Sequence, residues 1–222
     1  MSDETQAQAD QGDADAVLGQ SAAVRAYFGA QYDAVARYAA SLRAEGELRG
    51  LIGPREVARL WERHILNSAA VTPYLGQAGS IADIGSGAGL PGLVLAIQRP
   101  DVEVHLIEPM ERRTAWLQEC VEDLGLQNVQ VKRGRAEEYH GAFEVDVVTS
   151  RAVAALSKLA RMSLPLVRRG GAMVVLKGRN VEREIDPARK VLRSFKTAEP
   201  EILEGSTVEN VEPTTILRVR RP

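Results

Sequence analysis

The stretch "DIGSGAGLPG" (residues 83–92) decides the fold class. It follows a short apolar run and carries glycines at positions 85, 87, 89 and 92. From Asp83 it matches D-x-G-x-G-x-G, a pattern that suits S-adenosylmethionine (SAM). From Gly87 it also matches G-x-G-x-x-G, the dinucleotide fingerprint. Both patterns describe a glycine turn between a strand and a helix, so the stretch predicts a nucleoside-binding α/β fold and leaves the cofactor open.

Alternating elements surround this turn and predict the rest of the sheet. Helical patterns fill the gaps between short apolar strands, and this alternation is typical of a mostly parallel, doubly wound sheet. We predict strands at residues 80–85, 102–108, 128–134, 145–150, 171–178 and 214–221, and helices at about 90–99, 111–125 and 153–168. The sequence therefore predicts a Rossmann-like fold.

The chain divides into three parts by composition and pattern. Residues 1–20 hold five acidic residues and no Lys or Arg, so we expect a disordered acidic tail. Residues 21–76 show three- and four-residue apolar spacing, which predicts an N-terminal helical region packed on the core, with one helix from Pro54 toward Tyr74. Residues 77–222 form the predicted SAM-binding domain.

The overall composition excludes several classes of protein. Of 222 residues 45% are apolar and 26% are charged, the net charge is −2, and only one cysteine is present. A single cysteine excludes a disulfide within the chain and a paired-cysteine metal site, and we expect Cys120 to be a buried structural thiol. No run approaches the ~18 apolar residues that span a membrane. We therefore expect a cytoplasmic monomer without a metal ion and without a membrane partner.

Ligands of such sheets bind beyond the carboxyl ends of the strands. Four predicted strands end in polar or glycine-bearing sequence. We therefore expect the chemistry at residues 83–89, at Glu108, at residues 134–138 and at Ser150-Arg151.

Two residues favour SAM over a dinucleotide. Asp83 precedes the first glycine, where it would repel a pyrophosphate but tolerate the cationic groups of SAM. Pro91 interrupts the dinucleotide register, so we expect the helix to begin near Leu90 and the turn to be formed by Gly85, Gly87 and Gly89. Glu108 can accept the hydroxyls of a ribose in either cofactor. Glu137 is placed to accept the exocyclic amine of adenine.

Several segments resemble the bacterial small-subunit (16S) rRNA guanine-N7 methyltransferase family, RsmG or GidB. They appear in the family's order as "RHILNS" (63–68), "ADIGSGAGLPGLVLAI" (82–97), "GRAEE" (134–138), "SRAVAAL" (150–156) and "LKG" (176–178). The resemblance covers roughly residues 50–185. It implies a class I SAM-dependent fold and methylation of a guanine in 16S rRNA of the small ribosomal subunit, near the decoding centre. Carried over position by position, the SAM contacts are Gly85, Leu90, Ala136, Glu137 and Arg151. The chain departs from the family pattern at Asn67, where the family has Asp, and at "IEP" (107–109), where it has L-D-S.

The chemistry that the resemblance implies needs no general base. Guanine N7 carries a free lone pair on the Hoogsteen edge, so the enzyme has only to align it with the methyl group. Arg151 and Lys177 follow the fourth and fifth strands, and we predict that they act on the substrate. Other basic residues expected near this edge are Arg112, Arg113, Lys132, Arg133, Arg135 and Arg179. The alternatives are a SAM enzyme acting on a small molecule, an NAD-dependent oxidoreductase and a non-enzymatic RNA-binding protein.

Overall fold

Seven strands in the described part of the chain form one sheet. The computed structural model describes residues 3–151 and 153–222, with the backbone alone at residues 3–10 and 13. The strand order is β3-β2-β1-β4-β5-β7-β6. The strands are β1 (Ser80–Ile84), β2 (Glu103–Glu108), β3 (Val129–Arg133), β4 (Val145–Thr149), β5 (Val167–Leu176), β6 (Glu201–Gly205) and β7 (Thr214–Arg220).

The sheet is doubly wound, as predicted. Strand β1 pairs in parallel with β2 on one side and with β4 on the other. The chain therefore reverses its direction of travel across the sheet between β1 and β4, which is where such folds bind ligands. Strand β7 runs antiparallel between β5 and β6. Strand β6 was not predicted, because its segment has no strong apolar alternation.

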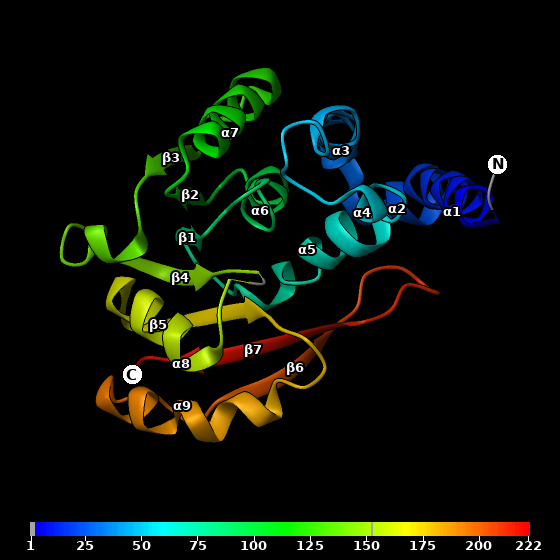
Figure 1. Ribbon diagram of the computed structural model, residues 1–222. Helices are drawn as coiled ribbons and strands as arrows, with labels where there is room; N and C mark the ends of the chain where they lie inside the picture. The colour runs from blue at the N-terminus through cyan, green and yellow to red at the C-terminus, as the bar shows by residue number, and fades with distance from the viewer. Residues whose placement is uncertain (1–2, 152) are drawn as a thin grey trace.

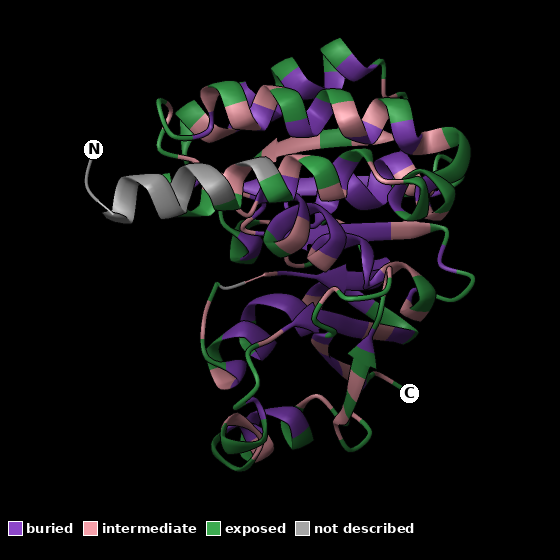
Figure 2. Cartoon of the chain, turned by 90° about the vertical axis from the view of Figure 1, so that its right-hand side faces the viewer, coloured by how far each residue is buried: buried purple, intermediate pink, exposed green. Residues whose placement is uncertain are grey.

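Helices cover both faces of the sheet (Figure 1). The N-terminal helices pack with α6 and α7 on one face, in one buried apolar cluster. Helices α8 and α9 pack on the other face, in a second cluster. Figure 2 shows that the strands between these layers are mainly buried. The helices are α1 (Asp3–Gln20), α2 (Ala22–Phe28), α3 (Tyr32–Glu45), α4 (Pro54–Val57), α5 (Asn67–Ala69), α6 (Gly92–Gln98), α7 (Glu111–Leu124), α8 (Leu156–Ser163) and α9 (Glu182–Ser194).

The predicted disorder of residues 1–20 is wrong where the structure describes them. Helix α1 covers Asp3–Gln20, and Asp15 is buried at 5% exposure. Its carboxylate accepts the backbone N–H groups of Trp61 and Glu62, each at 3.0 Å, and pairs with Arg43 at 3.0 Å. The acidic composition hid this anchor because a single buried acid cannot be told from solvated ones by composition. Residues 1 and 2 lie outside the described part.

The single helix predicted from Pro54 is divided into three segments. Helix α4 is followed by a π-helical segment, η2 (Trp61–Leu66), and then by α5. π-Helical turns are rare and are frequent at functional sites. Short 3₁₀ segments complete the chain at η1 (Gly29–Gln31), η3 (Thr72–Tyr74), η4 (Ala136–Tyr139) and η5 (Leu164–Leu166).

Helix α6 begins at Gly92, two residues later than predicted. Residues 85–91 form an irregular turn before it, and Pro91 occupies the position that precedes the helix. A Cβ atom on Gly92 would lie 2.6 Å from Asp83 Oδ2. Glycine at this position therefore lets α6 pack directly against β1.

Candidate cofactor and substrate site

The four predicted strand ends come together around one cavity of about 660 Å³. We call it the glycine-loop cavity. Its lining includes Gly85, Gly87 and Leu90 from the turn after β1, Glu108 after β2, Ala136 and Glu137 after β3, and Arg151 after β4. These residues are the predicted SAM contacts except for Asp83 and Gly89, which do not belong to the lining.

The glycine turn brings the backbone up to the cavity. Gly85 and Gly87 have φ angles of 68° and 56°, in the left-handed region that favours glycine. A Cβ atom on Gly85 would lie 2.8 Å from Val153 Cγ2. Both glycines are therefore required, the first also because the chain after β4 passes close to it.

The N-terminal helical region supports this turn from behind. The carbonyl of Ala88 accepts hydrogen bonds from the Tyr38 hydroxyl and from Trp116 Nε1, both at 2.9 Å. Tyr38 lies on α3 and is 1% exposed, and burial raises the pKa of its hydroxyl well above its usual value. The phenol therefore remains a donor, and α3 and α7 hold the glycine turn from two sides.

Glu108 places a buried carboxylate at the cavity wall. The residue is 2% exposed, and it lines the cavity. Its Oε2 accepts the N–H of Gly87 at 3.0 Å, and its Oε1 accepts the N–H of Met110 at 2.9 Å. Each oxygen keeps a further lone pair for a ligand hydroxyl. Glu108 thus links the glycine turn to β2, and its carboxylate can also accept hydrogen bonds from the hydroxyls of a ribose.

The start of η4 forms the wall beyond Glu108. Ala136 is buried at 4% exposure, whereas Glu137 is exposed, and both line the cavity. The carboxylate of Glu138 caps this segment by accepting the Arg135 N–H at 2.8 Å. The capping residue is therefore Glu138, which leaves Glu137 available to a ligand.

Asp83 lies behind the glycine turn and not in the cavity. It is fully buried, and its Oδ2 accepts the N–H of Gly92 at 2.9 Å. Burial raises the pKa of this carboxyl to about 7. The acid occupies the first N–H of α6, the position at which a dinucleotide pyrophosphate would bind. Asp83 does not line the cavity, contrary to its prediction as a cofactor contact, but it occupies an N–H group that a pyrophosphate would need.

Arg151 stands between the glycine-loop cavity and a second cavity of about 820 Å³. Its guanidinium donates from one terminal nitrogen to the Arg63 carbonyl at 3.1 Å and from the other to His64 Nδ1 at 2.8 Å. Val153 also lines both cavities. The two cavities therefore adjoin at Arg151. This residue follows the end of β4, as predicted.

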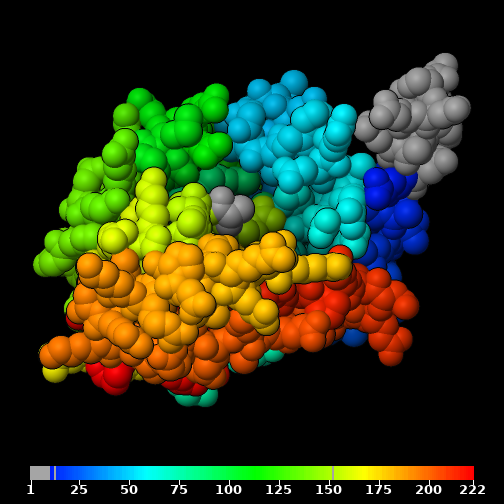
Figure 3. Space-filling view, turned by 60° about the horizontal axis from the view of Figure 1, so that its bottom comes forward, coloured from blue at the N-terminus to red at the C-terminus, as the bar shows by residue number. Residues whose placement is uncertain are grey.

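Three arginines line the second cavity, which we call the arginine cavity. Arg55, Arg59 and Arg63 come from the segment that contains α4 and η2, together with His64 and Asn67. Sequence reasoning missed them as site residues, although their spacing of four places them along one helix face. In Figure 3 the cyan surface of this segment faces the gold surface of the segment that follows β5.

Lys177 also lines the arginine cavity, but its ammonium group is engaged. It donates to the Ala154 carbonyl at 2.9 Å and to Glu184 Oε2 at 2.7 Å. The same Glu184 oxygen accepts the N–H of Leu156 at 2.6 Å, at the start of α8. Lys177 and Glu184 together hold the backbone at Ala154 and Leu156, at the start of α8.

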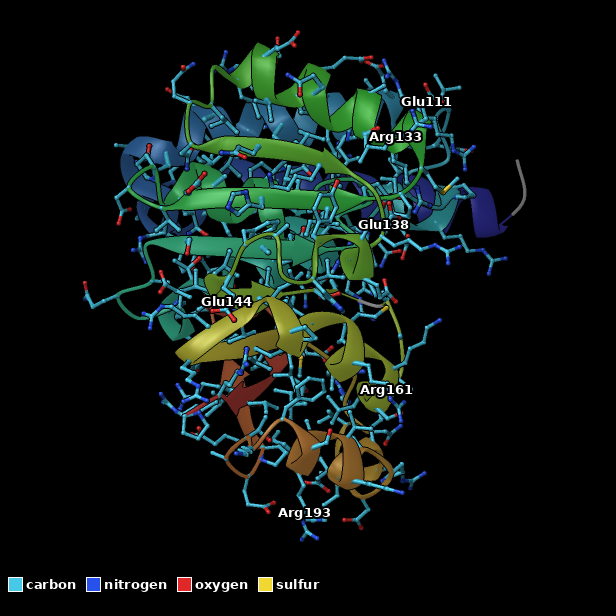
Figure 4. All side chains as sticks on the ribbon, turned by 90° about the vertical axis from the view of Figure 1, so that its left-hand side faces the viewer. Glu111, Arg133, Glu138, Glu144, Arg161 and Arg193 are labelled. Carbon is cyan, nitrogen blue, oxygen red and sulfur yellow. The ribbon has the colours of Figure 1, made fainter. Side chains whose placement is uncertain are left out.

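The other predicted basic residues do not form one cluster. Arg113 and Arg135 line the glycine-loop cavity. Arg133 pairs with Glu111 at 3.0 Å, at the edge of the sheet (Figure 4). Arg179 pairs with Glu212. Two of these arginines thus lie at the glycine-loop cavity, whereas Arg133 and Arg179 are each paired with a different glutamate.

Asn67 and Cys120 have structural surroundings. The Asn67 side chain donates to Thr214 Oγ1 at 2.8 Å and joins α5 to β7. Cys120 is buried as expected, and burial raises the pKa of its thiol to about 12. Within the described ranges, no three His, Cys, Asp or Glu side chains are grouped to hold a metal ion. No described helix has the length and apolar character to cross a membrane.

The residues present fit SAM. The cavity of about 660 Å³ is of the size that small cofactors occupy. It combines an open glycine backbone, a buried carboxylate for a ribose and an apolar wall that includes Leu90, Ile107 and Met162. At the start of α6 the N–H of Gly92 is already bound to Asp83, and Pro91 has no N–H. Few backbone donors therefore remain there for a pyrophosphate.

Comparisons with known proteins show the family of the chain. A family profile described as rRNA small subunit methyltransferase G (GidB) matches residues 31–210. The ribosomal RNA small subunit methyltransferase G of Paenarthrobacter aurescens (strain TC1) is 50% identical over 192 residues, which cover 86% of this chain and 89% of the relative. The protein of the same name from Beutenbergia cavernae is 48% identical over 198 residues, with 89% and 93% covered.

Solved structures support the fold. The O-methyltransferase TomG from Streptomyces achromogenes, in complex with SAM, matches with a TM-score of 0.55 at 16% identity, over 85% of this chain and 89% of its own. A precorrin-6y C5,15-methyltransferase from Geobacter metallireducens matches with a TM-score of 0.54 at 15% identity, over 78% and 91%. The fold is that of the class I SAM-dependent methyltransferases, and the NAD-dependent alternative is set aside. The chain belongs to the rRNA small subunit methyltransferase G family.

Proposed function

We propose that this enzyme transfers the methyl group of SAM to N7 of a guanine in 16S rRNA of the small ribosomal subunit. The observation that carries the proposal is the meeting of two cavities at Arg151, one built for a nucleoside cofactor and one rimmed by arginines. Membership of the family supports the same substrate. We expect the enzyme to act as a cytoplasmic monomer.

The glycine-loop cavity would hold SAM. We assign Gly85, Gly87, Leu90 and Ala136 to backbone and apolar contacts, Glu108 to the ribose hydroxyls and Glu137 to the adenine amine. When bound, SAM supplies an electrophilic methyl group on its sulfonium sulfur. Glu108 also fixes Gly87 by its hydrogen bond of 3.0 Å, so the same carboxylate shapes the turn and binds the ligand.

The arginine cavity would receive the target nucleotide. Arg55 is exposed and forms no ion pair with any described residue, and Arg63 reaches Glu212 only at 3.9 Å. Such arginines can bind phosphate oxygens in a bidentate manner. A guanine must leave its helix to enter a cavity of this kind, because side chains cannot read the deep major groove of A-form RNA. The substrate would therefore be a loop or a splayed nucleotide.

The reaction places few chemical demands on the protein. Guanine N7 attacks with its own lone pair, so no residue has to remove a proton. The pKa of His64 is lowered to about 4 and its Nδ1 accepts from Arg151, and the Lys177 ammonium group is engaged with Glu184. Neither side chain is therefore placed as a base. Arg151, at the boundary of the two cavities, would orient the base or the cofactor, and Lys177 would support the chain around it. Alignment of this kind is worth up to ~10⁵–10⁸ M in effective concentration.

A methylation assay tests the proposal. Labelled SAM is offered with naked 16S rRNA, with 30S subunits and with 70S ribosomes, and the product is mapped by cleavage that is sensitive to N7-methylguanine. We expect one labelled guanine in at least one of these substrates. Label on a small molecule alone, or on an RNA atom other than guanine N7, would overturn the assignment.

A further inference from the structure

Arg151 is oriented by a single segment of the chain. Both of its recorded acceptors, the Arg63 carbonyl at 3.1 Å and His64 Nδ1 at 2.8 Å, belong to η2. The two partners of Arg151 lie 88 and 87 positions away in the sequence. The N-terminal helical region therefore reaches into the methyltransferase domain at the boundary between its two cavities.

The protonation state of His64 follows from its partner. A guanidinium has only donors, so the Nδ1 that faces Arg151 must be the unprotonated nitrogen, and the ring proton lies on Nε2. The pKa of His64 is lowered to about 4, first by burial and then by the charge of Arg151. The charged groups that face it are Arg151, Arg63 and Glu56, whose Oε1 is 4.0 Å from Nε2. The imidazole is therefore neutral at physiological pH.

Holding Arg151 by two acceptors leaves most of its donors for ligands. A guanidinium carries five N–H donors, and the two contacts to η2 use one on each terminal nitrogen. The other N–H donors are not used by η2, and they belong to a residue that lines both cavities. A long side chain that is not held in this way would lose rotamer entropy when it bound a ligand.

We propose that His64 is a positioning residue for methyl transfer, which acts by accepting a hydrogen bond from Arg151 on Nδ1 and so aims the guanidinium at the junction of the cofactor and substrate cavities. The inference rests on the proposed role of Arg151 at this junction. It assigns a function to the π-helical segment, which carries both acceptors. His64 itself does not touch the reacting atoms.

Three substitutions of His64 separate this role from simple packing. His64→Asn keeps an acceptor near the position of Nδ1. His64→Gln moves its amide group to the position of Nε2, and His64→Leu removes the acceptor. We expect kcat to fall about 10- to 100-fold in the Leu and Gln variants and to recover to within about 3-fold of the wild type in the Asn variant. The KM for SAM should change less than kcat.

The control is His105→Leu, which removes another buried histidine, on a strand that β1 separates from β4. His105 lies on β2, and its ring packs against that of Phe143 with 4.8 Å between the ring centroids. We expect it to lower the melting temperature without the loss of kcat seen for His64→Leu. If His64 had a packing role alone, the kcat of the three His64 variants would fall in step with their melting temperatures, and kcat would not recover in the Asn variant. That result, or an unchanged kcat in His64→Leu, would overturn the proposal.

A second measurement does not depend on activity. Nitrogen NMR of ¹⁵N-histidine-labelled wild-type protein should show His64 with its proton on Nε2, and Arg151→Leu should raise the pKa of His64 toward the usual value. A proton on Nδ1 in the wild type would overturn the hydrogen bond itself. If the wild type failed to methylate rRNA but kept this tautomer, the proposed function would fail while the geometry of the His64–Arg151 pair stood.

Discussion

The carboxylate of Asp83 and the backbone N–H of Gly92 are joined by a hydrogen bond of 2.9 Å, entirely inside the protein. This bond closes the glycine turn from behind, since the first residue of α6 is tied back to the strand that precedes the turn. The acid of the D-x-G-x-G-x-G pattern thus shapes the glycine turn from inside the protein, whereas Glu108 and the glycine backbone line the cavity.

The first prediction concerns the pH dependence of stability at Asp83. Burial raises its pKa from 3.8 to about 7 in the folded protein, so the folded state retains a proton that the unfolded chain has lost. The contribution of this group to stability therefore falls as pH rises from about 4 to about 7. Asp83→Asn keeps an acceptor for Gly92 without a charge. We expect the variant to gain stability relative to the wild type across this window, on the order of a few kcal/mol.

Urea unfolding followed by circular dichroism at intervals between pH 4 and pH 7.5 measures this difference. The matched control is Asp101→Asn, whose carboxyl is exposed and has a pKa lowered by its hydrogen bond with Arg99. The difference in unfolding free energy between Asp101→Asn and the wild type should not change with pH above pH 5. Parallel curves for Asp83→Asn and the wild type would show that Asp83 does not titrate in this range.

The second prediction concerns SAM affinity at Glu108. Glu108→Ala removes the acceptors of the Gly87 and Met110 N–H groups and the proposed ribose contact together. Hydrogen bonds to a charged group are worth about 1.5–3 kcal/mol, so we expect the Kd for SAM to rise about 10- to 100-fold by isothermal titration calorimetry. Glu103→Ala, at the exposed start of β2, should leave it unchanged. An unaltered Kd in folded Glu108→Ala would remove the ribose assignment.

The third prediction concerns the pair formed by Lys177 and Glu184. Glu184 Oε2 accepts from both the Lys177 ammonium at 2.7 Å and the Leu156 N–H at 2.6 Å. Loss of either side chain should destabilise the same stretch of chain. We therefore expect Lys177→Met and Glu184→Gln to be non-additive, with a coupling of about 0.5–3 kcal/mol in a double-mutant cycle of unfolding free energies. Additive effects would instead leave Lys177 free for a direct role toward the substrate.

The fourth prediction concerns the anchor of α1. Asp15→Ala leaves the N–H groups of Trp61 and Glu62 without their acceptor and removes the partner of Arg43. A buried unsatisfied donor costs about 1–3 kcal/mol, and we expect a destabilisation of that size or larger. Amide hydrogen exchange should speed up at Trp61 and Glu62. Val17→Ser, at a side chain that is 71% exposed, is the control, and equal effects of the two variants would contradict an anchoring role.

Local pattern was enough to predict most of the architecture. Alternating strands and helices imply a doubly wound sheet, and the strand ends of such a sheet share one edge. For this reason Gly85, Glu108, Glu137 and Arg151 could be placed around one cavity from the sequence. The helix start at Gly92 lies two residues after the predicted position, because a proline near a helix start does not by itself fix which residue begins the helix.

Tertiary structure alone decided which distant residues meet. Nothing local shows that Asp15 caps η2, that Asp83 turns inward, or that His64 accepts from Arg151 across 87 positions of sequence. Hydrophobic periodicity defines which face of an element is buried, and it carries no information about which polar side chain across the core will satisfy a given donor. The sequence thus determined the fold and the cofactor edge, whereas packing between the N-terminal helices and the sheet decided how Arg151 is held and where the arginine cavity lies.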